Sequence, residues 1–249
     1  MVNLGNMKYE ITSLREVDST NSYALKNINS FKDRTVIYSL RQTNGRGRYN
    51  RHWVNDDTDN LYVSFVFKPD DILTYPLANL TQYLSVIVCR LLKNEFDIES
   101  NIKWPNDILV DGHKISGILA ETHMKNNQIE AIVLGLGLNV NLKEETVKEI
   151  DQKATSLNIL KHKNFDVDDI LNKLCNLFFN DYDEFIKKGF SFIKEEYISS
   201  SNLIDKEITL RGVNETKNYT VKTIDNEGFL TVKDKDNNEY TIMTGDVLC

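Results

Sequence analysis

The hydrophobic pattern of this chain changes near residue 202, and that change constrains the fold more than any other feature. Before it, stretches with strand-like and helix-like spacing alternate, which predicts a mixed α/β domain. After it come the short alternating stretches EITLRG, YTVKTI, FLTVK and EYTIM, separated by DNEG and DKDNN. Short strands joined by such turns are typical of a small barrel or sandwich. We therefore expect two domains, residues 1–201 and 202–249.

Regular spacing of apolar residues predicts several elements in the first part. Two long stretches have helical periodicity, one behind Pro76 and one that ends at Gly189. Asp18 and Ser19 form a polar cap before a shorter helix. The expected helices cover residues 20–28, 76–96 and 165–188; the expected strands cover 35–42, 60–69 and 128–142, with two more short strands around the turn at Asp111 and Gly112.

Composition excludes several classes of protein. A net charge of −7 over 249 residues argues against a general nucleic-acid binder, so any basic site must be local. No stretch reaches the roughly 18 apolar residues of a membrane span, and the start lacks a secretion signal. We expect a soluble, cytoplasmic protein with no membrane partner. Cys89, Cys175 and Cys249 are too far apart for a CxxC site, and no HExxH spacing occurs, so neither a disulfide framework nor a zinc centre is expected.

A basic loop lies at residues 42–53, QTNGRGRYNRHW, in this acidic chain. Two unit charges 4 Å apart interact by about 4 kcal/mol at an effective dielectric of about 20, so clustered arginines favour a bound anion. Glycines at 45 and 47 let the backbone approach that anion. A solvated surface loop and a phosphate contact to RNA remain alternatives. Neither GxxxxGK[ST] nor GxGxxG is present, so the loop is not a standard nucleotide motif.

Three further polar clusters follow. In KWPND (103–107), a carboxylate beside an amide suits a hydrated Mg²⁺ carried by a nucleotide, although a simple turn is the alternative. In KISGILAE (114–121), Lys114 would add a compact positive charge. In GLGLNVN (135–141), the glycines indicate either a bulge or the close approach of a ligand, and the two asparagines are expected on one strand face.

In this order, DSTN (18–21), QTNGRGR (42–48), RHW (51–53) and the three clusters above resemble the biotin-protein ligases. DNEGFLTV and YTIMTGDV resemble that family's C-terminal domain, so the resemblance runs from about residue 10 to the end. It implies an α/β catalytic domain with a mixed sheet, related to the class II aminoacyl-tRNA synthetase and lipoate ligase core, over residues 1–201. It also implies a small SH3-like β-barrel over residues 202–249.

The resemblance implies two half-reactions. Biotin and ATP, with Mg²⁺, give biotinyl-5′-AMP, and one lysine of a biotin carboxyl carrier domain then attacks the adenylate to form an amide. Neither step needs a protein nucleophile, so the protein supplies charge and position. The basic loop would offset the repulsion between the biotin carboxylate and the triphosphate.

The resemblance also assigns roles to residues. Lys114 and Arg48 would be catalytic, through charge stabilisation. A helix cap is the alternative for Ser19, and a buried structural role is the alternative for Trp53. The biotin-binding residues would be Ser19, Thr20, Asn21, Gln42, Arg46, Gly47, Arg48, Trp53, Lys114 and Gly117, and the ATP or adenylate contacts would be Arg46, Arg48, Arg51, Lys103, Asn106, Asp107 (also to Mg²⁺ through ATP), Gly135, Gly137 and Asn139.

This chain departs from the family pattern at Tyr49, where another basic residue is common, and at Asn50, where a small residue is common. Asparagine tolerates a positive φ, so we expect the turn to survive at Asn50. Only 17 residues precede Asp18, which favours the monofunctional type with no DNA-binding domain and no DNA partner. Some members pair through sheet edges, so a homodimer stays open.

Three rival functions remain. A lipoate-protein ligase shares the adenylate chemistry, but lipoate has no ureido ring for the polar DSTN and Gln42 groups. A non-catalytic biotin- or nucleotide-binding module would bind without turnover. An RNA-binding protein would show salt-sensitive affinity for nucleic acid.

Overall fold

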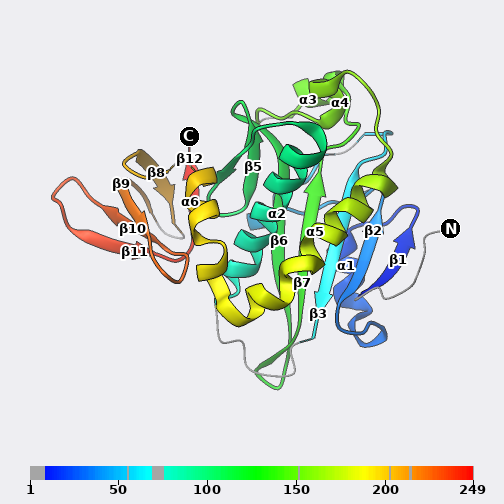
Figure 1. Ribbon diagram of the computed structural model, residues 1–249, viewed down its shortest axis with the longest axis horizontal. Coiled ribbons are helices and arrows are strands. Elements are labelled where there is room, and N and C mark those ends of the chain that lie inside the picture. The colour runs from blue at the N-terminus through cyan, green and yellow to red at the C-terminus, as the bar shows by residue number, and fades with distance from the viewer. Residues whose placement is uncertain are drawn as a thin grey trace. The chain divides into compact units, whose positions relative to one another are not determined.

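The computed structural model describes residues 9–54, 56–68, 76–150, 152–201, 203–212 and 215–248 (Figure 1). The chain divides into two compact units. The first contains Met1–Thr74 and Gly112–Cys175, and the second contains Tyr75–Asp111 and Asn176–Cys249. Residue 202, where the sequence predicts a boundary, lies outside the described residues, as does Cys249. The division at 202 therefore stays a prediction.

The first unit is built on a mixed sheet. Its strands lie in the order β1-β2-β3-β7-β6, and only β1 and β2 pair in parallel. The β6–β7 hairpin is the longest pairing, because both strands continue to a turn at residues 126–127. The strands are β1 (Glu10–Leu14), β2 (Thr35–Ser39), β3 (Leu61–Phe67), β6 (His113–Lys125) and β7 (Gln128–Leu138).

Helix α1 (Thr20–Lys26) packs on one face of this sheet. Ser19 caps it, because its hydroxyl accepts a hydrogen bond from the Ser22 N–H, as the sequence predicts. The contact between α1 and the sheet is apolar toward the far end of the helix. The buried side chains of that cluster are Ala24, Ile28, Ile37, Val66, Ala131 and Val133. This burial fixes α1 on the sheet and so positions the residues at its N-terminus.

The first unit also holds η1 (Ile28–Ser30), η2 (Arg48–Asn50), α3 (Glu144–Lys148) and α4 (Leu157–Lys161). Helix α5 (Val167–Lys188) begins in this unit and ends in the second.

The second unit contains helix α2 (Ala78–Phe96), the hairpin of β4 (Asn101–Lys103) and β5 (Asp107–Val110), η3 (Gly189–Phe192) and α6 (Lys194–Ser201). The Tyr83 ring of α2 stacks on Phe185 at 4.3 Å, and its hydroxyl donates to the Phe178 carbonyl at 2.6 Å. A five-stranded antiparallel sheet follows in the order β11-β10-β9-β8-β12. Its strands are β8 (Glu207–Arg211), β9 (Thr216–Ile224), β10 (Leu230–Lys233), β11 (Glu239–Ile242) and β12 (Asp246–Leu248).

Two buried amides of α2 bind the turn between β9 and β10. Asn79 Nδ2 donates to the Glu227 carbonyl at 2.8 Å, and Gln82 Nε2 donates to the Gly228 carbonyl at 2.6 Å. A Cβ at Gly228 would lie 2.5 Å from Gln82 Oε1, and its φ of +87° is in the left-handed region. Glycine therefore lets this turn reach the helix.

The predicted fold class is confirmed: a mixed-sheet α/β structure with a second, antiparallel sheet. The three predicted helices are present, although α2 begins at Ala78, two residues after Pro76. The prediction that the strand at 128–142 carries Asn139 and Asn141 on one face is wrong, because β7 ends at Leu138. Strands β1, β4 and β12 and helices α3, α4 and α6 are not predicted. Among the described residues, no helix is long and apolar enough to span a bilayer.

Candidate ligand-binding site

A floor of three glycines, with Leu119 beside them, lies on the α1 face of the first sheet. Gly117 of β6 pairs with Gly137 of β7, and Gly135 of β7 pairs with Leu119 of β6. Directly opposed residues share a face, so the three glycines form one strip. The alternative of a bulge at Gly135 and Gly137 is wrong, since the β6–β7 register shifts only between His123 and Met124.

Asn21 of α1 lies over one end of this floor. Its Nδ2 donates to the Leu119 carbonyl at 3.1 Å and to Glu121 Oε2 at 2.9 Å, and its Oδ1 lies 2.6 Å from the Ser64 hydroxyl. A Cβ at Gly135 would lie 2.2 Å from Asn21 Oδ1, so this glycine makes room for Asn21. Asn21 is 4% exposed, and both of its amide protons are donated within the protein.

The polar contacts continue from Ser64 to Gln42. The Ser64 hydroxyl lies 2.8 Å from Thr20 Oγ1, and Gln42 Oε1 accepts from the Thr20 N–H at 2.7 Å and from its hydroxyl at 3.2 Å. The side-chain oxygens of Asn21, Ser64, Thr20 and Gln42 therefore make three contacts with one another. Only the hydroxyls of Ser64 and Thr20 carry protons that these oxygens can share, so acceptors outnumber donors. This acceptor-rich cluster suits a ligand that donates an N–H group.

Trp53 covers the other end of the floor. Its indole would lie 2.7 Å from a Cβ at Gly117 and 2.9 Å from one at Gly137, so both glycines admit the ring. The Lys114 Nζ lies 5.0 Å from the centroid of the Trp53 ring, as a cation–π contact, and 3.1 Å from the Cβ position of Gly117. The ammonium group therefore lies at the glycine floor.

The arginines of the basic loop lie in two different environments. Arg46 Nη2 donates to both carboxylate oxygens of Glu121, at 3.0 and 2.9 Å. The guanidinium carbons of Arg48 and Arg51 lie 5.0 and 6.0 Å from the ring centroid of Tyr49. The positive φ expected at Asn50 is instead at Tyr49, whose φ is 55°. The loop closes because the Gly47 N–H donates to the Arg51 carbonyl at 2.7 Å.

Four residues predicted for ATP belong to other elements than this strip. Lys103, Asn106 and Asp107 belong to the β4–β5 hairpin of the second unit, where Lys103 pairs with Asp107. Asn139 belongs to the first unit, but its Nδ2 donates to the Thr155 carbonyl at 3.0 Å. Within the described ranges, no group of three His, Cys, Asp or Glu side chains could hold a metal ion.

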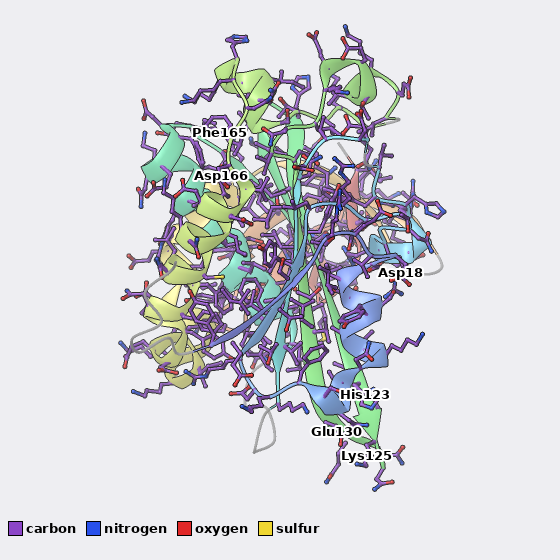
Figure 2. The ribbon with its side chains drawn as sticks, turned by 90° about the vertical axis from the view of Figure 1, so that its right-hand side faces the viewer. Asp18, His123, Lys125, Glu130, Phe165 and Asp166 are labelled. Atoms are coloured by element: carbon purple, nitrogen blue, oxygen red, sulfur yellow. The ribbon has the colours of Figure 1, made fainter. Side chains whose placement is uncertain are left out.

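The sequence patterns do not assign Ser64 or Glu121 to the site, although the structure places both in it. Ser64 interrupts the apolar run LYVSFVF inside β3, which is fully buried, and that interruption is its only signal. Glu121 lies at the end of KISGILAE, where a partly exposed strand residue is ordinary. Figure 2 shows that α1 extends from the Asp18 end toward the tip of the β6–β7 hairpin, where His123, Lys125 and Glu130 gather. The candidate site lies at the Asp18 end.

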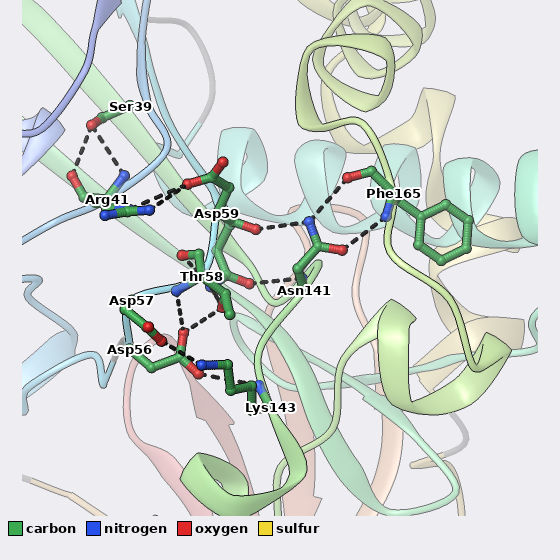
Figure 3. Close-up of polar contacts among 10 residues, drawn as sticks. Ser39, Arg41, Asp56, Asp57, Thr58, Asp59, Asn141, Lys143 and Phe165 are labelled. Atoms are coloured by element: carbon green, nitrogen blue, oxygen red, sulfur yellow. Dashed lines mark hydrogen bonds and ion pairs between the residues drawn. The ribbon is translucent and has the colours of Figure 1, made fainter.

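The segment after the basic loop is fixed by a polar cluster (Figure 3). Asp56 accepts hydrogen bonds from the N–H and hydroxyl of Thr58, from the Thr146 hydroxyl and from the Lys143 N–H. Asn141 Nδ2 donates to the carbonyls of Asp59 and Phe165, at 3.0 and 2.9 Å. The chain that leaves the loop is therefore bound to the segment that follows β7.

Asp56 makes stability sensitive to acid. Burial acts to raise the pKa of this carboxyl, but its hydrogen bonds from Thr58, Thr146 and Lys143 outweigh burial and lower the pKa below 3.8. A lowered folded pKa gives stability that is present above the unfolded value of about 3.9 and is lost as the pH falls through the folded pKa. We expect Asp56→Asn to be less stable at pH 7 and to lose less stability than wild type between pH 5 and 3, measured by urea unfolding.

The matched control is Asp236→Asn, at an exposed carboxylate of the second unit, which is expected to follow the wild-type pH dependence. Equal loss of stability in Asp56→Asn and wild type across this range would contradict the assignment.

Comparisons with known proteins agree with this geometry. The sequence model of the biotin/lipoate A/B protein ligase family matches residues 13–139. The bifunctional ligase/repressor BirA of Bacillus spizizenii is 29% identical over 206 residues, which are 82% of this chain and 63% of BirA. A biotin–[acetyl-CoA-carboxylase] ligase of Mycobacterium tuberculosis is 30% identical over 63% of this chain and 58% of its own length. The chain thus spans under two thirds of these relatives.

A solved structure covers more of both chains. The biotin protein ligase from Aquifex aeolicus, in complex with biotin and ATP, superposes with a TM-score of 0.83 at 26% identity. The match covers 96% of this chain and 97% of that one. The family match over half of the chain includes α1, the basic loop and the glycine strip. This chain belongs to the biotin/lipoate A/B protein ligase family.

Proposed function

We propose that this protein is a biotin-protein ligase that makes biotinyl-5′-AMP from biotin and ATP and transfers biotin to a lysine of a biotin carboxyl carrier domain. The likeness to an enzyme crystallised with biotin and ATP, over 96% of this chain, supports the proposal. The acceptor-rich cluster of Asn21, Ser64, Thr20 and Gln42 carries it, because the ureido ring of biotin offers N–H donors.

The chemistry needs charge and alignment. In the first step the biotin carboxylate attacks the α-phosphorus of ATP, the α–β phosphoanhydride bond breaks and pyrophosphate leaves. In the second step the carrier lysine amine attacks the acyl carbon, AMP leaves and the amine proton is lost to solvent. Lys114 is proposed to stabilise the negative charge on the carboxylate and α-phosphate in both steps, since its ammonium lies at the glycine floor.

The remaining residues have proposed positions along the acid and the nucleotide. Ser19, Thr20 and Gln42 would surround the ureido ring, with Asn21 holding them in place and Arg46 at the border. The chain of the acid would run along the strip of Gly117, Gly135 and Gly137, over the Asn21 side chain and the Trp53 ring that fill the space above these glycines. Gly47, Arg48 and Arg51 would fold over the adenylate and exclude water.

The ATP phosphates are proposed to bind Lys103, Asn106, Asp107 and Asn139, with Mg²⁺ arriving on the nucleotide. Because the described residues include no three-residue metal group, the ion would take most of its ligands from phosphate and water, with Asp107 as one carboxylate. Mg²⁺ would neutralise the triphosphate and favour departure of pyrophosphate.

The test is exchange of labelled pyrophosphate into ATP with biotin, with lipoate and with no acid. We expect exchange with biotin alone. Exchange with lipoate alone would move the activity to lipoate ligation, which the same family includes. No exchange with either acid, from folded protein with Mg²⁺ present, would leave a binding protein and contradict the proposal.

A further inference from the structure

Glu121 lies where it controls the charge at one end of the glycine floor. It pairs with Val133 on the α1 face of β6, beside the Leu119–Gly135 pair. Its carboxylate accepts from Asn21 on one side and from Arg46 on the other, and its side chain is only 23% exposed. Hydrogen bonds from two separate segments therefore hold this carboxylate in one orientation.

Arg46 would otherwise attract an acid ligand to this end. The planar guanidinium is the side chain that best matches a carboxylate. Its Nη2 is bound to Glu121, and its Nε is buried without a hydrogen-bond partner among the described residues. Without Glu121, a cation with spare donors would stand beside the Asn21–Ser64–Thr20 cluster.

The reactive cation lies at the opposite end. Lys114 Nζ is 3.1 Å from the Cβ position of Gly117, and Gly117 is four residues from Glu121 along β6. Four strand residues span roughly 13 Å, which is on the scale of an extended acid such as biotin. Lys114 thus lies at one end of the floor and Arg46 at the other, and the carboxylate of Glu121 is hydrogen-bonded to Arg46.

We infer that Glu121 is a positioning residue that sets the direction in which the acid binds: it neutralises Arg46, so that the carboxylate of the acid goes to Lys114. This inference rests on the proposed ligase function. Loss of the Glu121 charge would let the acid also bind reversed, with its carboxylate on Arg46 and away from the α-phosphate of ATP.

Reversed binding has a distinct kinetic signature. A non-productive complex competes with the productive one, so it lowers kcat and the apparent KM for biotin by the same factor and leaves kcat/KM nearly unchanged. A merely structural role for Glu121 would loosen the site, which raises KM and lowers kcat/KM. The two roles therefore predict opposite changes in KM.

The experiment measures biotin-dependent pyrophosphate exchange in wild type, Glu121→Gln and Glu121→Gln/Arg46→Gln. We expect E121Q to lower kcat and KM together by about tenfold, since about 1.4 kcal/mol corresponds to that factor. The double variant is expected to regain kcat relative to E121Q, because the competing cation is gone, while its KM for biotin is expected to exceed that of wild type, because Arg46 borders the ureido ring. Glu121→Asp, which keeps the charge, is expected to lie closer to wild type than E121Q and serves if E121Q does not fold.

Biotin amide is the binding control, because it has no carboxylate to place on Arg46. Its inhibition constant is expected to be the same in wild type and E121Q. A raised KM in E121Q with no recovery in the double variant would overturn the inference. Wild type without exchange would instead overturn the proposed function, so the two failures are distinguishable.

Discussion

Replacing Lys114 with alanine is expected to slow biotin-dependent pyrophosphate exchange by about 10²- to 10³-fold, the usual loss when one group that stabilises developing charge is removed. The ammonium lies at the glycine floor, 5.0 Å from the Trp53 ring centroid and 3.1 Å from the Cβ position of Gly117. The loss is expected in kcat, because the charge on the α-phosphate grows in the transition state. Initial-rate exchange assays over a range of biotin concentrations measure it.

The matched control is Lys125→Ala, a lysine on the same strand that pairs with Glu130 at the other end of the hairpin. That variant is expected to exchange at the wild-type rate. Circular dichroism checks the fold of both variants, since Lys114→Ala also removes the cation–π contact with Trp53, worth about 0.5–1 kcal/mol at an exposed site. Wild-type exchange by folded Lys114→Ala would remove Lys114 from the mechanism.

The Gly135→Ala variant is expected to lose both stability and biotin affinity. The added methyl would lie 2.2 Å from Asn21 Oδ1 and 2.7 Å from its Cγ, so the asparagine must leave its place. Overpacking costs about 1–3 kcal/mol. Displaced Asn21 would also release Ser64 and Glu121, so we expect the KM for biotin to rise by at least about tenfold, which corresponds to about 1.4 kcal/mol.

Urea unfolding and exchange kinetics test this variant. Gly212→Ala is the control, because a Cβ there would lie 3.4 Å from the Glu215 carbonyl, an ordinary contact. Its stability is expected to stay within about 0.5 kcal/mol of wild type. A Gly135→Ala protein with wild-type stability and KM would show that Asn21 has no role in holding the acid.

Local sequence patterns predict the helices well, because the spacing of apolar residues that defines an amphipathic helix lies within one segment. The periodicity of residues 77–91 and the cap at Ser19 each correspond to an observed helix. Local sequence does not determine where β6 and β7 end, because their ends depend on pairing with other strands. The sequence therefore places Asn139 on a strand that stops at Leu138.

The site shows the same limit. The motifs bring Thr20, Gln42 and Lys114 to attention as candidates, and the structure places all three in the first unit. The sequence does not show which side chain each glycine makes room for, because Gly135 and Asn21 are 114 positions apart and meet only after folding. Likewise, Ser64 and Glu121 become informative only through their contacts with Asn21. A role that depends on a partner far along the chain can be assigned only from the folded structure.

The turn at Glu227 and Gly228 has a practical consequence for protein engineering. Two amides inside α2 donate to its carbonyls, so removal of the C-terminal sheet would take both acceptors away from the helix. A shortened chain that ends at residue 201 would lose these two hydrogen bonds, each worth about 0.5–1.5 kcal/mol net. Exchange of this sheet between family members would succeed only where the donor's turn also offers two carbonyls and a glycine to the helix.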